Sequence, residues 1–328
     1  MTLKHATLRQ LKVFETVARK LSFSRAASEL HLTQPAVSMQ VKLLESQAGL
    51  PLFEQIGKRI HLTEAGQELY RRSLAVADEL RAAEESLNSL RGLEQGRLHV
   101  ALVSTATYFA PPLLARFLKT HPGVTAKLSV DNRETVLAQL AANEIDFAIT
   151  GHPPEHLDTV AEAFAPHPHV IVAHPAHVLA GKRRIPLKRV AAETFVMREP
   201  GSGTRGLLER LFAGHALPLK VNMEMASNES IKQAVMAEMG VAFLSLHTVG
   251  LELATGRLAT LDVQGLPIVR HWYVVHLAQK RLSPIALALK EFLRQEAGTF
   301  LAGWGTRHPA GAAAASALYN FGGPASSG

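Results

Sequence analysis

Residues 22–47 of the chain read SFSRAASELHLTQPAVSMQVKLLESQ, which is two short helical patterns separated by a tight turn. Ser24 can cap the first helix and Thr33 the second, because both side chains can accept a hydrogen bond from a first-turn N–H group. Pro35 fits the first turn of the second helix, where the N–H groups have no intrahelical partner. The pattern predicts a helix-turn-helix.

The second helix of this motif is expected to have one buried and one polar side. Val37, Val41 and Leu44 recur at helical spacing and predict the buried side. The polar side offers an amide, a hydroxyl and an ammonium group, which can reach base edges and phosphates in a DNA major groove. An ordinary three-helix bundle with a solvated face remains the alternative. The residues of the motif expected to contact DNA are Ser24, Thr33, Gln34, Pro35, Ala36, Ser38, Met39 and Lys42.

Both flanks extend the motif. Downstream, residues 49–66 read GLPLFEQIGKRIHLTEAG, an apolar anchor followed by a turn and a short strand over residues 59–62. This is a β-wing that places Lys58 and Arg59 at its tip, where they can contact phosphates. Upstream, the apolar side of an amphipathic helix is predicted at Leu8, Leu11, Phe14, Val17 and Leu21.

Residues 64–91 predict one long helix that Thr63 caps. Its other faces are strongly charged, so a coiled coil of two chains is favoured over a core helix within one subunit. A dimer would also present two DNA-reading helices to a two-fold site. The seven-residue repeat that predicts the seam consists of Leu69, Ser73, Val76, Leu80, Ala83, Leu87 and Leu90.

Charge and composition narrow the class of protein. The 328 residues carry a net charge of +7 and include no cysteine, which excludes disulfides, thiolate metal sites and thiol nucleophiles. Residues 1–63 carry +5 and residues 64–96 carry −3, so the basic charge is densest where DNA binding is predicted. Neither a signal peptide nor a membrane span is predicted, and the expected location is the cytoplasm.

From residue 97 onward, short Val/Ile/Leu-rich runs alternate with helical stretches, which is typical of parallel βα units. Two α/β lobes are expected, joined by crossover strands near 160–166 and 267–274. The expected boundaries are 97–162 and 268–302 for lobe I, 163–267 for lobe II, and 303–328 for an Ala/Gly/Ser-rich tail expected to be disordered.

The segment 198–205, REPGSGTR, predicts a strand end, a glycine turn and a helix start. Free N–H groups, two hydroxyls and two guanidinium groups would converge there, which suits a carboxylate or phosphate. A glycine turn with an ordinary cap is the alternative, and for Arg133 a surface salt bridge is an equal alternative. The residues expected to bind a small anion in the cleft between the lobes are Ser104, Thr105, Arg133, Thr150, Arg198, Ser202, Gly203, Thr204 and Arg205.

Metal binding and catalysis have little support in the sequence. His167 and His169 alternate in a predicted strand, and His174 and His177 follow, but no carboxylate or second pair completes a metal site. No nucleophile, base and acid can be assigned together, so an enzyme is not expected.

The N-terminal 66 residues resemble the LysR-type transcriptional regulators, in LRQLKVFETVARKLSFSRAASELHLTQPAVSMQVKLLESQAGLPLF and LTEAG. The resemblance implies an N-terminal all-α winged helix-turn-helix, a long linker helix, and a C-terminal two-lobed α/β effector domain like the periplasmic binding proteins. One position departs from the family pattern, because Gln55 stands where an arginine is usual, two residues after the wing phenylalanine. LFEQIGKRIHLTEAG is similar instead to the subgroup that regulates the Calvin-cycle (RuBisCO) operons.

The resemblance also implies partners. These are double-stranded promoter DNA, RNA polymerase, further copies of the chain in a homodimer or tetramer, and an anionic effector rather than a cofactor. For this subgroup the effector would be ribulose bisphosphate, phosphoenolpyruvate or NADPH, acting on an activator of CO2 fixation. The alternatives are a family member with an amino acid or aromatic acid effector, and a solute-binding protein or small-molecule enzyme with an N-terminal helical bundle.

Overall fold

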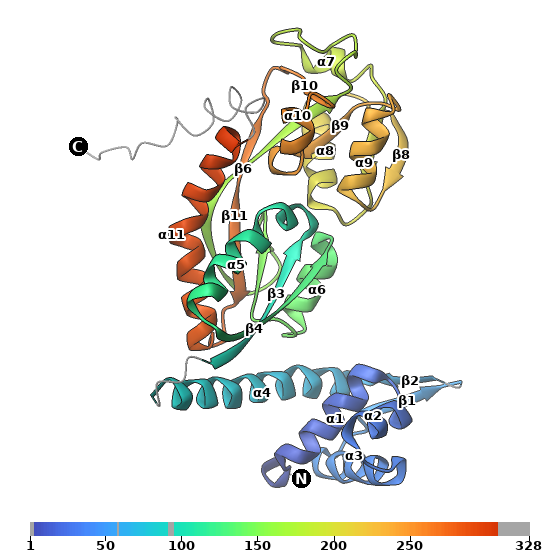
Figure 1. Cartoon of the computed structure of the whole chain (residues 1–328). Helices are drawn as coiled ribbons and strands as arrows, with labels where there is room; N and C mark the ends of the chain where they lie inside the picture. The colour runs from blue at the N-terminus through green and yellow to red at the C-terminus, as the bar shows by residue number, and fades with distance from the viewer. Residues whose placement is uncertain (1–2, 58, 91–94, 308–328) are drawn as a thin grey trace, which may run out of the picture. The chain divides into compact units, whose positions relative to one another are not determined.

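The computed structural model describes residues 3–57, 59–90 and 95–307. Its contacts divide the chain into two compact units, Met1–Leu87 and Asn88–Gly328. Figure 1 shows a small unit of helices with a two-stranded hairpin and a larger α/β unit.

The N-terminal unit is a winged helix-turn-helix, as the sequence predicts. Val37 and Val41 are buried against the other helices, and Leu44 packs with Phe14 and Leu52. The helix-turn-helix consists of α2 and α3, and the wing consists of β1 and β2. The elements are η1 (Leu3–His5), α1 (Leu8–Lys20), α2 (Phe23–Leu30), α3 (Gln34–Ala48), β1 (Phe53–Ile56), β2 (Arg59–Leu62) and α4 (Glu64–Leu90).

The predicted caps are partly correct. Thr33 caps α3, with its hydroxyl accepting from the Ala36 N–H at 3.4 Å. Ser24 does not cap α2: Ser22 does, because α2 already begins at Phe23 and the Ser22 backbone is extended. The apolar side predicted for α1 is also too long. Leu8 and Leu21 lie at its two ends and are about half exposed, at 55% and 46%.

The wing joins the long helix through close backbone packing. The strand predicted over 59–62 is present as β2, and it pairs antiparallel with β1, which was expected only as an apolar anchor. Thr63 caps α4, since its hydroxyl accepts from the Gly66 N–H at 3.0 Å. A Cβ atom at Gly66 would lie 2.0 Å from the Leu52 carbonyl oxygen, so only glycine fits at this junction.

The C-terminal unit has two lobes, and both predicted crossover strands are present. Lobe I contains β3, β4, β5, α5, α6 and α11, and lobe II contains β7 to β10 with α7 to α10. The strands are β3 (Gln95–Val103), β4 (Gly123–Asp131), β5 (Phe147–Thr150), β6 (Thr159–Ala173), β7 (Phe195–Arg198), β8 (Val221–Met225), β9 (Ala242–Ser245), β10 (Ala259–Thr260) and β11 (Ile268–Leu277). The helices are η2 (Ser104–Tyr108), α5 (Ala110–Thr120), α6 (Arg133–Ala141), α7 (Leu187–Val190), α8 (Gly203–Gly214), α9 (Asn228–Met236), η3 (Leu246–Thr248), α10 (Gly250–Ala254) and α11 (Pro284–Arg307).

Strand pairing explains how the lobes are linked. In lobe I, β3 pairs parallel with β4 and β5, and in lobe II β7 pairs parallel with β8. The long strands β6 and β11 pair antiparallel with each other and run from one lobe into the other (Figure 1). Since parallel strands present their carboxyl ends at one edge, the segments after β3 and β5 lie at the same edge of the lobe I sheet. The segment after β7, from the separate β7–β8 sheet of lobe II, lines the same cavity between the lobes. The helix α11 continues to Arg307, five residues past the boundary expected at 302, and residues 308–328 of the expected tail lie outside the described residues.

Candidate DNA-reading helix and anion-binding cavity

The side of α3 that faces away from its buried residues is open. Thr33, Gln34, Pro35, Met39 and Lys42 are exposed, while Ala36 and Ser38 are half-buried beside them. A shallow depression on this surface is lined by Gln34, Pro35, Ser38, Met39, Lys42 and Leu43. Most of the residues predicted to contact DNA therefore share one accessible helix face, together with Leu43, which the prediction omitted.

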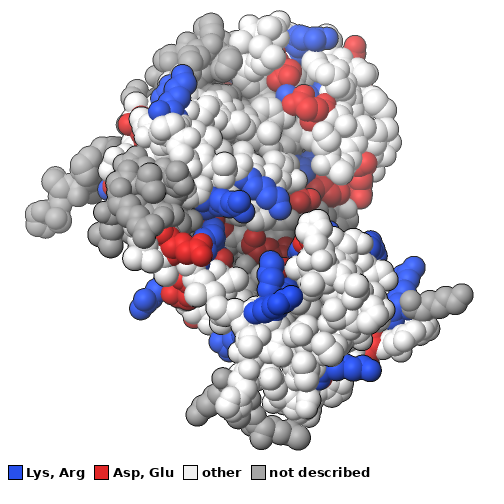
Figure 2. All heavy atoms as spheres, turned by 60° about the horizontal axis from the view of Figure 1, so that its bottom comes forward, with Lys and Arg blue, Asp and Glu red and all other residues white. Residues whose placement is uncertain are grey.

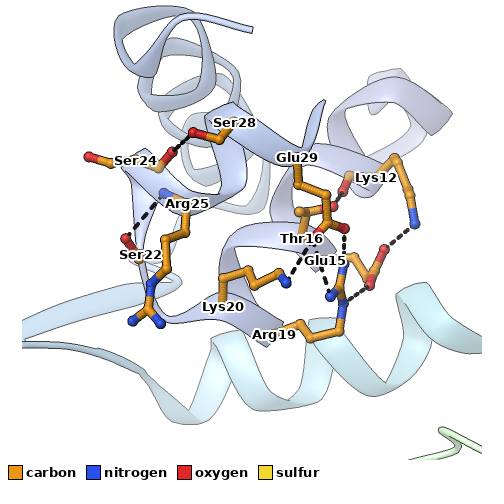
Figure 3. Close-up of polar contacts among 10 residues, drawn as sticks. All are labelled: Lys12, Glu15, Thr16, Arg19, Lys20, Ser22, Ser24, Arg25, Ser28 and Glu29. Atoms are coloured by element: carbon orange, nitrogen blue, oxygen red, sulfur yellow. Dashed lines mark hydrogen bonds and ion pairs between the residues drawn. The ribbon is translucent and has the colours of Figure 1, made fainter. Parts of the chain in front are cut away.

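Several cations near α3 already have carboxylate partners (Figure 3). Lys12 pairs with Glu15 at 2.6 Å, and Lys20 pairs with Glu29 at 2.9 Å. Arg19 contacts both of these carboxylates and links α1 to α2. Hydrogen bonds from the Arg19 and Lys20 side chains lower the pKa of Glu29 to about 2. Part of the N-terminal basic charge therefore joins the helices and is not available to phosphates.

Arg25 is a candidate for contact with a DNA phosphate that was not predicted from the sequence. In Figure 3 its guanidinium group extends away from the α1–α2 ion pairs, and no described residue accepts a hydrogen bond from it. It is exposed in the first turn of α2, beside Ser24, which is also exposed. The first helix of a helix-turn-helix crosses the DNA backbone, so an arginine at its start is suited to phosphate contact.

The wing retains one described cation at its tip. Arg59 is exposed, whereas Lys58 lies outside the described residues. The Gln55 side chain donates to the Gly57 carbonyl oxygen at 3.0 Å, a contact that remains inside the wing. On the face drawn in Figure 2, Lys and Arg lie in separate patches with Asp and Glu among them.

The long helix α4 exposes part of the seven-residue repeat that predicts a coiled coil. Leu69 is half-buried near the wing and Ser73 is buried, its hydroxyl donating to the Leu69 carbonyl oxygen. Further along, Val76, Leu80 and Leu87 are 41%, 44% and 58% exposed within the single chain. Leu90 lies in a part of the helix whose side chains are outside the described residues.

A cavity of about 610 Å³ lies between the lobes of the C-terminal unit. Its walls combine the segments after β3, β5 and β7, the start of α6, much of α8, and the middle of β6 and β11. All nine residues predicted to bind an anion line it, namely Ser104, Thr105, Arg133, Thr150, Arg198, Ser202, Gly203, Thr204 and Arg205.

Two of the predicted arginines have their charges already matched. Arg198 is 3% exposed and makes two hydrogen bonds to Glu199, at 2.7 and 2.8 Å, and a third to Asn228. Arg205 pairs with Glu209 at 2.7 Å and Glu224 at 2.8 Å. The prediction of both as anion ligands did not account for these carboxylates.

Three other guanidinium groups lie together without such partners. Arg133, Arg210 and Arg270 line the cavity, and none has a carboxylate within ion-pair distance among the described residues. Arg133 donates only to the carbonyl oxygens of His152 and Pro153, and its buried Nε finds no acceptor in the described structure. Burial and the charges of Arg210 and Arg270 lower the pKa of Arg133. We call Arg133, Arg210 and Arg270 the arginine triad.

Two members of this triad were not predicted from the sequence. Arg210 lies on α8 seven residues after Gly203, so the helical repeat places both on the same side, and this spacing could have identified it. Arg270 is on β11 and pairs in register with His167, a relation between distant segments. His152 also lines the cavity, and burial together with Arg270 and Arg133 lowers its pKa.

The cavity also offers hydroxyl groups as hydrogen-bond donors. Ser202 is the N-terminal boundary residue of α8, yet its side chain makes no cap hydrogen bond, contrary to the ordinary-cap alternative. Among the described residues, the hydroxyls of Ser104, Thr105 and Thr204 likewise have no hydrogen-bond partner. Hydroxyls and first-turn N–H groups of a helix can hold a carboxylate or phosphate.

The cavity floor contains buried imidazoles. His167 and His169 face the same side of β6 with ring centroids 4.1 Å apart, and His167 stacks on Trp272 at 3.7 Å. The His247 ring accepts a hydrogen bond from the Trp272 indole N–H at 3.2 Å. Burial lowers the pKa of His169 to about 4 and that of His247 to about 3, and it places the pKa of His167 well below its ordinary value.

These histidines do not form a metal site in the described structure. Within residues 3–57, 59–90 and 95–307, no group of three or more metal-ligating side chains is placed to hold an ion. His174 and His177 instead accept backbone N–H groups at Ala176 and Leu179. No helix in this described part of the chain is long and apolar enough to cross a membrane.

Family models match both units of the chain. Residues 8–67 match the bacterial regulatory helix-turn-helix protein of the lysR family, and residues 91–298 match the LysR substrate binding domain. The first match covers the helix-turn-helix, the wing and the start of α4. The second covers both lobes and the cavity.

Individual proteins are similar over the same regions. The RuBisCO operon transcriptional regulator of Allochromatium vinosum is 51% identical over 293 residues, covering 89% of this chain and 97% of the relative. The regulatory domain of Synechocystis PCC6803 CcmR, solved in complex with 2-PG, is 42% identical, covers 61% of this chain and 96% of its own, and superposes with a TM-score of 0.60. A full-length OxyR variant from Pseudomonas aeruginosa is 21% identical, covers 89% of this chain and 98% of its own, and shares the fold with a TM-score of 0.72.

Proposed function

The chain belongs to the LysR family of DNA-binding transcriptional regulators, and we propose that it activates a RuBisCO operon in response to a small phosphorylated acid. It is a regulator and not an enzyme, which removes the alternatives of a solute-binding protein and of an enzyme with a helical bundle. The pathway rests on the A. vinosum relative and on a cavity suited to an anionic metabolite.

The observation that carries the proposal is that the arginine triad and hydroxyls without a hydrogen-bond partner in the described structure line the same cavity. Three like charges without carboxylate partners are costly to hold together in a half-buried site. A bound phosphate would offset that cost through charge-assisted hydrogen bonds. A carboxylate on the same molecule would then reach the hydroxyls of Ser202 and Thr204 at the start of α8.

The class of effector follows from these two sites, one for a phosphate and one for a carboxylate. 2-Phosphoglycolate carries a phosphate and a carboxylate on a two-carbon frame, and the related CcmR domain was solved with 2-PG. Ribulose bisphosphate and phosphoenolpyruvate offer comparable pairs of anionic groups. An aromatic or amino acid effector lacks the phosphate, so the arginine triad favours the phosphorylated class over it.

The test is a titration of the full chain bound to DNA from upstream of the RuBisCO genes. We expect 2-phosphoglycolate to change the DNase footprint, while glycolate, which lacks the phosphate, has no effect at the same concentration. Inorganic phosphate alone controls for charge without the carbon frame. If none of the phosphorylated acids, including ribulose bisphosphate and phosphoenolpyruvate, alters the footprint, the effector proposal is wrong.

The DNA side of the proposal has its own test at Gln34, which is exposed at the start of α3. Gln34→Ala should weaken binding to the operator by about 1–3 kcal/mol and binding to random DNA little, because a base contact is specific. Arg59→Ala should weaken both and reduce the salt dependence, because a phosphate contact is not specific. Equal losses of operator and random DNA binding for Gln34→Ala would remove it from base recognition.

Assembly is part of the same proposal. The exposed repeat on α4 supports a dimer through a coiled coil, and two such dimers would form the tetramer proposed to act with RNA polymerase in the cytoplasm. Leu80→Asp introduces a charge into the seam and should dissociate or unfold the dimer. A stable dimer of this variant in analytical ultracentrifugation would contradict the coiled coil.

A further inference from the structure

A buried lysine lies where the two lobes meet, outside the cavity lining. Lys232 on α9 is 2% exposed, and its ammonium group contacts Glu229 at 2.8 Å and Glu252 at 2.9 Å. It also donates to the Thr248 carbonyl oxygen at 3.1 Å. All of these partners belong to lobe II, so lobe II itself neutralises the charge.

Lobe I completes this cluster with a tyrosine. Tyr108, the last residue of η2, places its ring 5.0 Å from the Lys232 ammonium group and donates its hydroxyl to Glu229 at 2.5 Å. Burial and the bond to Glu229 raise the pKa of Tyr108, so the phenol remains a hydrogen-bond donor at neutral pH. The hydroxyl therefore makes a charge-assisted hydrogen bond from one lobe to the other.

Both ends of this bond are connected to the cavity wall. Tyr108 ends the short helix that begins with Ser104 and Thr105, which line the cavity. Glu229 follows Asn228, whose side chain accepts a hydrogen bond from Arg198 at 2.8 Å. The bond thus joins the hydroxyl wall of lobe I to the Arg198 wall of lobe II.

We propose that Tyr108 is a positioning residue, whose bond to Glu229 holds the lobes at the separation in which both walls reach the effector. An anion bound across the cavity needs groups from both lobes at once, and a change of even 1 Å in their separation weakens it. This inference rests on the proposed function for its effector, whereas the lobe separation itself is a property of the unliganded chain.

Tyr108→Phe tests the proposal with little risk to folding, because the ring over Lys232 remains and only the hydroxyl is removed. Loss of a hydrogen bond to a charged group should raise the Kd for 2-phosphoglycolate about 10-fold in the full chain, measured by calorimetry. Tyr273→Phe is the matched control: this tyrosine lies on β11 of the same unit, and its hydroxyl has no hydrogen-bond partner among the described residues. Its Kd should change less than about two-fold, because the half-buried ring keeps its packing and no hydrogen bond is lost.

The lobe separation can be measured directly, since the chain has no cysteine of its own. Spin labels at Lys119→Cys on α5 and Arg189→Cys on α7 place one exposed label on each lobe. We expect the distance distribution to broaden or shift in Tyr108→Phe and to stay unchanged in Tyr273→Phe, without effector. Labelled chains are diluted with unlabelled ones so that each assembly reports a single pair.

The two readouts separate the possible failures. An unchanged distance distribution in Tyr108→Phe overturns the positioning role, whatever the effector. If the wild-type chain binds no 2-phosphoglycolate but the distribution shifts in Tyr108→Phe, the effector proposal fails and the lobe contact stands. If the lobes separate yet 2-phosphoglycolate binds the variant as tightly as the wild type, the link from Tyr108 to affinity is wrong.

Discussion

The two arginine groups of the cavity differ in what surrounds them. Arg198 and Arg205 belong to the REPGSGTR segment, and each is already bonded to glutamate. The arginine triad comes from α6, α8 and β11, and no carboxylate in the described structure pairs with it. Paired arginines shape a wall, whereas unpaired arginines are available to bind a ligand. Charge in a motif is therefore a weaker guide to function than charge left without a partner.

The largest expected effect concerns the buried imidazoles of β6 and η3. His167, His169 and His247 have lowered pKa values in the folded chain, so the unfolded chain binds more protons below about pH 6.5. Stability is therefore fully present above that pH and is lost as the pH falls through 6 and 5. Each imidazole should cost about 2 kcal/mol at pH 5 relative to pH 7, which is about 6 kcal/mol for the three together.

Urea unfolding of the chain at pH 7 and pH 5 measures this effect. His174→Gln with His177→Gln is the control, because these histidines are only partly buried and lie outside the floor. Replacing them should leave the pH dependence in place. A free energy of unfolding that is the same at both pH values would mean that the three imidazoles are not held neutral.

The next largest effect is expected from removing Arg198, one of the two arginines that are paired with glutamate. Arg198→Ala should lower the free energy of unfolding by about 3–5 kcal/mol, because it leaves Glu199 and Asn228 without their buried partner. Arg210→Ala, at the exposed rim of the cavity, is the comparison. It removes one of three like charges, so the unliganded chain should be as stable as the wild type or slightly more stable. Urea unfolding at pH 7 measures the free energy of unfolding of both variants. A larger decrease for Arg210→Ala than for Arg198→Ala would contradict the distinction between paired and unpaired arginines.

The arginine triad should matter instead for binding. Arg270→Gln removes a guanidinium that no described carboxylate neutralises, so the Kd for 2-phosphoglycolate should rise about 30- to 150-fold, which corresponds to 2–3 kcal/mol. The unliganded chain should keep its stability, since the lost charge repels Arg133 and Arg210. Calorimetric titration measures the Kd, and operator binding without effector is the control. Unchanged effector affinity would remove Arg270 from the site.

The sequence predicted local features well. The helix-turn-helix, the caps at Thr33 and Thr63 and the alternation of strands and helices depend on residues close together in the chain, and all are present. The cap of α2 was placed two residues late, because Ser22 and Ser24 are chemically equivalent candidates and only the backbone at Ser22 distinguishes them. The turn before α8 was recognised from its glycines.

Pairing between distant segments was not predictable in the same way. The sequence indicated a crossover strand over 267–274, but not the register of its pairing with β6, which places Arg270 beside His167 at the cavity. Glu224, which neutralises part of the Arg205 charge, lies at the end of β8, 19 positions further along the chain. Glu199 follows Arg198 directly in the sequence, but whether its carboxylate accepts two hydrogen bonds from Arg198 depends on side-chain orientation, which the sequence does not give. The cavity wall was therefore predicted more accurately than the roles of its arginines.

The smallest expected effect is at Arg205, and it distinguishes most sharply between the motif and the structure. If the REPGSGTR segment binds the anion through its own arginines, Arg205→Ala should weaken 2-phosphoglycolate as much as Arg270→Gln does. The structure predicts less than about a five-fold change, because Glu209 and Glu224 already accept hydrogen bonds from Arg205. Both carboxylates are about half exposed, so water can replace the guanidinium group.

Removing Arg205 leaves those carboxylates near the cavity, and their repulsion of the anion accounts for the small loss. The double variant Glu209→Gln with Arg205→Ala should therefore recover part of the affinity, measured by the same titration. A loss above 30-fold for Arg205→Ala, with no recovery in the double variant, would show that Arg205 turns from its glutamates to the ligand and that pairing in the unliganded chain does not identify the binding arginines.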